Sequence, residues 1–155
     1  IGKLDILLGY ALAFAVLATL QGTISGLVGF LLLDVQAEGP AWGVVLLAIA
    51  NALLGMSLGL FFSAFAKTEF QAVQFMPAIL IPQILVSGLL VPREMMPRAL
   101  ELVSNALPVT YAYDALTRIT ANDTSARFWF DVGIVLGAIS LALILGAATL
   151  RRRTG

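Results

Sequence analysis

The side chains that carry most protein chemistry are scarce in this sequence. It contains neither cysteine nor histidine, which excludes disulfides, thiolate nucleophiles and the usual zinc sites. Asp131 is the only acidic residue inside a long apolar run, so the paired catalytic groups of an intramembrane protease are missing. A nucleotide-binding loop of the form Gly-x-x-x-x-Gly-Lys-Ser/Thr is also absent. We therefore predict that this chain is not an enzyme and binds no metal or other cofactor itself.

The polar residues that remain inside apolar sequence are mainly amides, and they are accompanied by prolines. Gln21, Asn51 and Gln83 lie within or beside apolar runs, where an amide either bonds across a helix interface or lines a path. Pro77 and Pro82 lie inside a single run, and each removes a helix hydrogen bond and crowds the preceding turn. We expect a kinked or partly unwound helix there, either as a static bend or as a moving part.

The elements that must position these residues belong to a very apolar chain. Of its 155 residues, 60% are hydrophobic and only 12% are charged, which is the composition of an integral membrane protein. This composition predicts that the chain is surrounded by a lipid bilayer. The formal net charge is zero, so we predict no nucleic-acid partner. We predict an all-α integral membrane protein with one transmembrane domain over residues 1–155. Its four transmembrane helices are expected at residues 6–33, 42–66, 70–91 and 128–150.

The segment between the last two runs is too short and too polar for another span. Three prolines divide it: Pro92, Pro97 and Pro108. Apolar residues recur on one helical face over residues 97–107. A second short helix over residues 109–119 would place Asp114 and Arg118 as an i,i+4 ion pair. We predict short re-entrant or interfacial helices over residues 92–121.

Small residues four positions apart recur in three of the runs. The pairs are Gly22 with Gly26, Gly55 with Gly59, and Gly133 with Gly137. This spacing lets a second helix backbone approach closely, so we predict that these glycines pack against other helices. Such packing would equally suit a membrane assembly or anchor subunit that transports nothing, which is the alternative to a transport function.

The distribution of basic residues predicts an orientation. Four spans place both chain ends on one side, which also receives Lys3, Lys67 and the three arginines at 151–153. Cytoplasmic loops are enriched in Lys and Arg, so we predict a multi-pass protein of the plasma membrane, the inner membrane in a bacterium, with both ends cytoplasmic. Residues 92–121 would then be external.

Four motifs follow one another over about forty residues. They are Phe70-Gln-Ala-Val-Gln-Phe-Met-Pro77, Pro82-Gln-Ile-Leu-Val-Ser-Gly88, Pro92-Arg-Glu-Met-Met-Pro97 and Leu107-Pro108-Val-Thr-Tyr111. This series resembles the C-terminal part of type-2 ABC exporter permeases, and the daunorubicin-resistance type in particular. The flanking runs fit as well, so the resemblance covers essentially the whole chain.

The resemblance implies the membrane subunit of an ATP-driven exporter of drugs, antibiotics, lipids or glycans. Such subunits have six spans, so this chain would be a fragment that holds the last four. They act as dimers with a second permease copy or a paralogue. Two cytoplasmic ABC ATPase subunits bind the ATP and magnesium. Residues 92–119 would match external re-entrant helices above the path, and residues 70–91 would line the path and the dimer interface. The cytoplasmic helix that docks the ATPase has no counterpart in this sequence.

The candidate gate positions combine the prolines with the residues beside them. They are Pro77, Pro82, Gln83, Ser87, Gly88, Pro92, Met95, Met96, Pro97, Pro108 and Tyr111. The two methionines are either a flexible surface that adapts to substrate or interfacial packing. An ion-coupled carrier is disfavoured, because such carriers keep an ionisable group near the middle of the membrane.

Overall fold

The computed structural model describes residues 3–32 and 37–152, with side chains described over residues 9–32 and 37–149. Within that part the chain is helical and contains no strand, which confirms the predicted all-α fold. The elements are α1 (Lys3–Leu31), α2 (Ala41–Ser63), α3 (Glu69–Val86), the 3-10 helix η1 (Arg93–Met95), α4 (Arg98–Ala106), α5 (Pro108–Thr120) and α6 (Ala126–Arg152). Four of them, α1, α2, α3 and α6, are long and apolar enough to cross a membrane.

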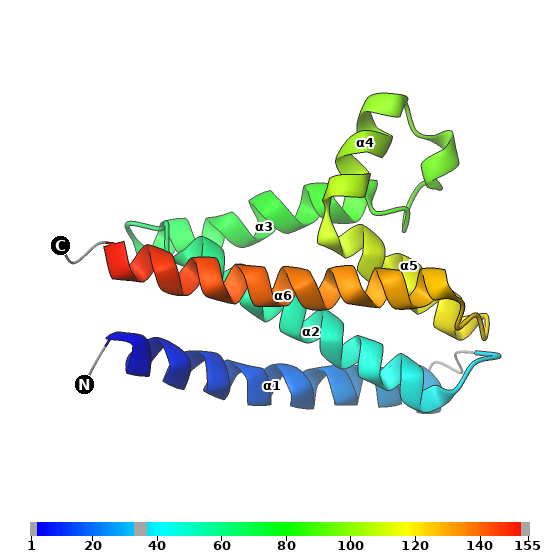
Figure 1. Cartoon of the computed structure of the whole chain (residues 1–155), viewed down its shortest axis with the longest axis horizontal. Coiled ribbons are helices and arrows are strands. Elements are labelled where there is room, and N and C mark those ends of the chain that lie inside the picture. Colours follow the sequence, from blue (N-terminus) through cyan, green and yellow to red (C-terminus); the bar gives the residue numbers. More distant parts are fainter. Residues whose placement is uncertain (1–2, 33–36, 153–155) are drawn as a thin grey trace.

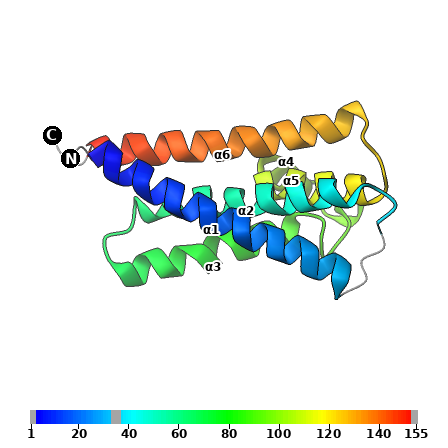
Figure 2. The ribbon, with the colours of Figure 1, turned by 90° about the horizontal axis from the view of Figure 1, so that it is seen from below.

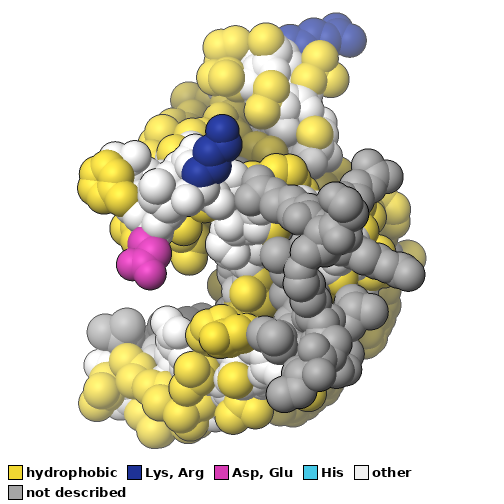
Figure 3. All heavy atoms as spheres, turned by 90° about the vertical axis from the view of Figure 1, so that its left-hand side faces the viewer, with side chains coloured by type: hydrophobic (Ala, Val, Ile, Leu, Met, Phe, Trp, Pro, Cys, Tyr) yellow, Lys and Arg dark blue, Asp and Glu magenta, His cyan; other side chains and the backbone are white. Residues whose placement is uncertain are grey.

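The long helices run side by side along the molecule, with α2 between α1 and α6 (Figure 1, Figure 2). The start of α1 and the end of α6 lie at one end of the molecule, together with the turn between α2 and α3. We call the opposite end, where α5 and the loop before α2 lie, the far end. Hydrophobic side chains are visible on the described parts of the end shown in Figure 3, and large hydrophobic side chains of the long helices, such as Val16, Val73 and Ile144, are exposed along their length. The bundle therefore presents an apolar surface of the kind that faces lipid.

Close contact between α1 and α2 depends on two glycines of α1. A Cβ atom on Gly22 would lie 2.7 Å from the Cα atom of Ile49, and one on Gly26 would lie 3.1 Å from a Val45 methyl group. Any larger side chain at Gly22 would push the two helices apart. The first of the predicted glycine pairs thus lies at a helix interface, as its spacing suggests.

The buried core lies towards the far end, where α5 inserts between α2 and α6. Ala115 and Ile119 of α5 pack with Val44, Leu47 and Phe128. A second cluster joins Ala112 of α5 to Leu54 and Val135. The short helix α5 is consequently part of the core even though it is not a membrane span.

The expectation for the third span is a kinked or partly unwound helix, and its predicted end is corrected. The helix continues through Pro77 and Pro82, so the partly unwound alternative is not present and the kinked one stays a prediction. Both prolines lie on the exposed side of α3, and the φ of proline fits an α-helix, so the helical path continues although each ring removes one hydrogen bond. The span also ends at Val86 instead of residue 91, because the chain turns at Ser87 and Gly88.

The other predicted spans differ from the observed helices by a few residues at their ends, as helix boundaries commonly do. The predicted end of the first span at residue 33 lies outside the described residues. Arg153, on which the charge argument partly rests, also lies outside them.

Candidate functional site

The candidate site is the short-helix region, which we define as residues 87–121 at the far end. Each proline in it begins a helix: Pro92 precedes η1, Pro97 precedes α4, and Pro108 is the first residue of α5. Proline suits these positions because the first N–H groups of a helix have no partner within the helix. The prolines thus divide the region into the short helices that the sequence predicts.

The region begins with a sharp turn at the end of α3. Gly88 adopts φ +98°, which glycine tolerates and other residues rarely do. Ser87 is 1% exposed and donates a hydrogen bond from Oγ to the carbonyl oxygen of Ile84 at 2.9 Å. This turn sends the chain away from α3 towards η1.

Polar contacts connect η1 and α4 to α5. Arg93 of η1 pairs with Asp114 of α5 and donates to Asn105 Oδ1 at 3.3 Å. The Tyr111 hydroxyl donates to the carbonyl oxygen of Asn105 at 2.6 Å. The predicted ion pair between Asp114 and Arg118 is wrong, because Arg93 reaches Asp114 from η1 while Arg118 turns towards α6.

A second polar contact between α4 and α5 is fully buried. The hydroxyl groups of Ser104 and Thr110 lie 3.1 Å apart, and both residues are 0% exposed. One hydroxyl donates to the other, so each has a hydrogen-bond partner where water is excluded, as buried polar groups require.

Asp131 of α6 binds Arg118 near the C-terminal end of α5. Its carboxylate is 0% exposed and accepts a hydrogen bond from Arg118 Nε at 3.1 Å. Arg127 Nε lies 3.4 Å from the other carboxylate oxygen, and Arg118 also donates to Asp123 at 2.8 Å. The sequence indicated the solitary acid but not this role; its need for a cationic partner was the available signal.

The environment changes the acidity of two aspartates in this region. Burial raises the pKa of Asp114, against the lowering effect of the neighbouring Arg93, and the charge of Asp131 adds to the increase. Hydrogen bonds from Ser125, and then from Arg118, lower the pKa of Asp123. Within residues 3–32 and 37–152, no group of acidic side chains comes together as a metal site would require.

An apolar hollow separates the end of α3 from η1 and α4. Its volume is about 390 Å³, and its lining consists of Pro82, Leu85, Val86, Val91, Met95, Met96, Pro97 and Leu100. The structure thus brings four of the candidate gate residues, two prolines and two methionines, onto one hollow.

A comparison with known families identifies the family of this chain. A model of the family described as ABC-2 type transporter matches residues 2–120. The chain belongs to the ABC-2 type transporter family. It is therefore the membrane permease component of an ABC-type transporter, a transport part that is not itself catalytic. No curated protein and no solved structure matches the chain.

Other candidate residues of this ABC-2 permease do not belong to the lining of the hollow. Pro77 is on the exposed side of α3, whereas Gln83 of the same helix is 6% exposed, and its Oε1 has no hydrogen-bond partner among the described residues. Gln21 is exposed on α1, and no hydrogen bond of its side chain occurs within the described residues. The amide at position 21 therefore does not join two helices of this part of the chain.

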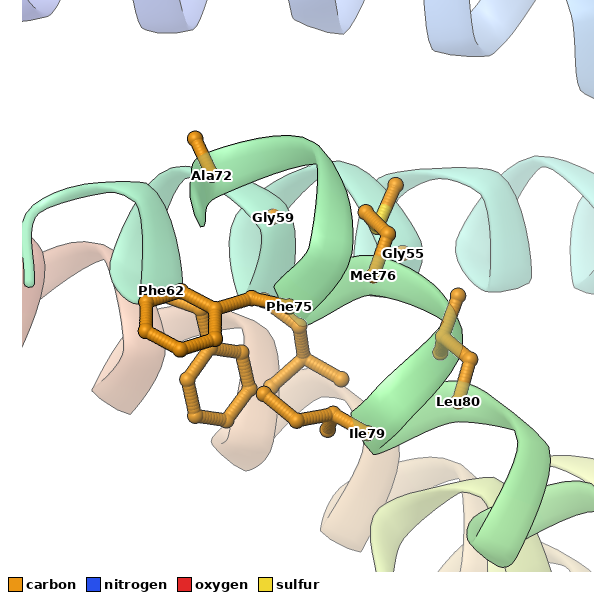
Figure 4. Close-up of a pocket in the computed structure, with 9 residues that line it drawn as sticks. Gly55, Gly59, Phe62, Ala72, Phe75, Met76, Ile79 and Leu80 are labelled. Atoms are coloured by element: carbon orange, nitrogen blue, oxygen red, sulfur yellow. The ribbon is translucent and has the colours of Figure 1, made fainter. Parts of the chain in front are cut away.

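The second and third glycine pairs of the permease have different surroundings from the first. Gly55 and Gly59 face α3 across a narrow pocket lined by Phe62, Phe75 and Met76 (Figure 4). A Cβ atom on Gly59 would meet Met76 at 3.8 Å, and one on Gly55 would meet nothing within 4 Å. A Cβ atom on Gly133 or Gly137 of α6 would likewise meet nothing within 4 Å. Packing at these last three positions stays a prediction about helices outside the described chain.

A glycine that sequence reasoning missed is the most tightly enclosed of those named here. A Cβ atom on Gly39 would lie 1.7 Å from the backbone oxygen of Ile119. The N–H groups of Glu38 and Gly39 donate to the carbonyl oxygen of Thr120 at 2.8 and 3.3 Å. The loop before α2 is thereby fastened to the end of α5. A lone glycine in a polar loop gives no sequence signal of this contact.

Proposed function

We propose that this chain forms the translocation path of an ATP-driven ABC exporter for hydrophobic or amphipathic substrates. The substrate class comprises drugs, antibiotics, lipids and glycans, and the daunorubicin-resistance motifs favour antibiotic efflux. The chain would supply four spans of a six-span subunit in the plasma membrane, with both of its ends cytoplasmic.

The outward face of α3 is the observation that carries this proposal. α3 is the least buried of the four candidate spans. Pro77 and Pro82 remove the donors that would serve the carbonyl groups of Val73 and Ala78. Gln74 is exposed on the same helix. Unsatisfied backbone groups are costly in hydrocarbon, so this face is better suited to a hydrated path or a partner helix than to lipid.

The partners follow from the same helix. A second permease copy or a paralogue would face α3 and close the path. A cytoplasmic ABC ATPase, with its ATP and magnesium, would supply the energy. No acidic or basic side chain lies within α3 beyond its first residue, Glu69, so the driving force has to come from outside this segment.

The substrate class is supported by the lining of α3. The helix offers apolar side chains and a few amides, without a fixed charge for a counter-ion. A path of this kind suits a molecule with large apolar surface. The short-helix region would cover the exit and act as the gate.

The first test is a pull-down of the tagged, full-length subunit from native membranes in gentle detergent, followed by mass spectrometry. We expect a stoichiometric ABC ATPase. If the subunit is abundant and folded but no ATPase accompanies it, the exporter proposal fails and an assembly subunit becomes the better description.

A second test addresses the gate. We expect Gly88→Ala and Pro97→Ala to lower export of a fluorescent amphipathic substrate by about tenfold while membrane insertion is unchanged. Gly88→Ala forces an unfavourable φ, and Pro97→Ala loosens the start of α4. Thr124→Ala, in the exposed loop before α6, is the matched control. Normal export by both gate variants would contradict the gate assignment.

A further inference from the structure

The short-helix region consists of two parts that are packed very differently. Ala112, Ala115 and Ile119 of α5 are buried in the clusters that join α2 to α6. In contrast, Ser104 is the only buried residue of α4, and η1 has none. In Figure 1, α4 stands away from the long helices, whereas α5 lies among them. The two parts thus share a region of sequence but not a core.

The less packed part is the η1–α4 segment, which we define as residues 89–106. A non-helical residue adjoins it at each end. Gly88 has φ +98°, and Leu107 is extended, with φ −99° and ψ 129°, between α4 and α5. Hinges are commonly a few residues at the ends of elements that absorb changes in φ and ψ. Both boundaries of the segment are of this kind.

The contact of the segment with α3 is incomplete. The hollow of about 390 Å³ lies between them, with Leu85 and Val86 on one side and Met95, Met96 and Leu100 on the other. The side chains that line this open hollow have no protein atoms opposite them, so α3 and the segment lack the mutual dispersion contacts of a packed interface. Apolar packing therefore holds this segment only weakly.

Polar contacts provide the specific attachment to α5. They are the pair between Arg93 and Asp114, the buried hydroxyl pair of Ser104 and Thr110, and the hydrogen bond from Tyr111 to Asn105. Arg93 also donates to Asn105, so this one side chain links η1, α4 and α5. Removing the Arg93 side chain would free η1 from α4 and α5.

We infer that the η1–α4 segment is a lid that swings from α5 about Gly88 and Leu107, and that Arg93 is its latch. The buried part, α5, stays with α2 and α6 when the lid opens. The inference specifies which piece of the proposed gate moves, so its importance for export rests on the proposed function. The motion itself requires neither ATP nor substrate.

Residues 1–155 contain no cysteine, so a thiol introduced there competes with no native thiol of this segment; any cysteine elsewhere in the full-length subunit is first replaced by serine. Ser104→Cys places a thiol on the side of the lid that contacts α5, where the native residue is 0% exposed. Ile119→Cys places a thiol near the C-terminal end of α5, where the native residue is 2% exposed. Isoleucine is larger than cysteine, so this control is biased towards labelling. The full-length permease is held in lipid nanodiscs, which expose both faces, and is treated with a charged maleimide.

We expect the thiol at position 104 to react while the thiol at position 119 stays protected. Adding Arg93→Gln to Ser104→Cys should raise its labelling rate by about fivefold, the effect of losing one modest contact. Arg127→Gln is the matched control, because Arg127 pairs with Asp131 and not with the lid. If Arg93→Gln does not give a monodisperse protein, Asp114→Asn replaces it. Equal rates at positions 104 and 119, or equal effects of Arg93→Gln and Arg127→Gln, would overturn the lid. Neither result depends on transport, so a failed exporter proposal would be recognised separately in the pull-down.

Discussion

Helices α4 and α5 are joined by a single residue, yet they occupy opposite environments. α5 inserts into the core and is fastened at its end by the loop before α2. α4 stands off the bundle and exposes Leu102 and Val103. Both helices are short and amphipathic, so amphipathicity alone did not separate them. What separates them is whether an apolar partner surface is available on the long helices.

The far end therefore combines a tightly packed helix, α5, with a loosely packed one, α4. Elements with few buried apolar contacts open at lower free energy than elements in a core. A gate built from such an element can move without disturbing the spans. The strongest tests therefore change the attachment of α5, and the weaker ones change that of the lid.

The largest effect is expected from Gly39→Ala. Its methyl group would overlap the backbone oxygen of Ile119, which no side-chain rearrangement relieves. We expect a loss of about 4 kcal/mol in the free energy of unfolding, or failure to fold. The measurement is unfolding by sodium dodecyl sulfate in mild detergent. Gly133→Ala is the control, because a Cβ atom there meets nothing within 4 Å. Similar stability of the two variants would contradict the tight attachment of α5.

A smaller effect is expected when the link between α5 and α6 is cut. Asp131→Asn removes the charge that pairs with Arg118 and Arg127. Arg118 is partly exposed and regains water, so we expect a loss of about 2 kcal/mol, below that of a fully buried pair.

Arg93→Gln should cost less than about 1 kcal/mol in the same assay, because the lid can open and hydrate Asp114. A larger loss for Arg93→Gln than for Asp131→Asn would reverse the comparison.

The smallest effect is a dependence of stability on pH. Burial raises the pKa of Asp114 above its ordinary value of 3.8. The folded protein then binds this proton more tightly than the unfolded chain does. Stability should therefore fall as the pH rises from 3.8 through the raised pKa, and Asp114→Asn should remove this decline. Asp123 acts in the opposite direction, because its lowered pKa gives stability that is lost as the pH falls through that value. Unfolding midpoints measured from about pH 3 to pH 7 would reveal both slopes. An unchanged profile for Asp114→Asn would contradict the assignment.

Several features were predictable because they depend on local sequence. The four spans follow from long apolar runs, and the prolines at 92, 97 and 108 mark the starts of the short helices. The ordered motifs indicated the ABC-2 family, which the match to residues 2–120 shows. Other expectations failed because they treated residues as local pairs. Arg118 is spaced to meet Asp114 but instead meets Asp131, thirteen positions away.

The membrane setting and the four spans could be predicted from the sequence because hydropathy and the placement of proline act within a few residues along the chain. The family followed from the order of the motifs. The tertiary structure was needed to see that α5 belongs to the core while α4 stands outside it. It also decided that Gly39 is enclosed by Ile119 and that Arg93 reaches Asp114. Those contacts join segments far apart in the chain, and their energies depend on burial and distance, which exist only once the helices have packed.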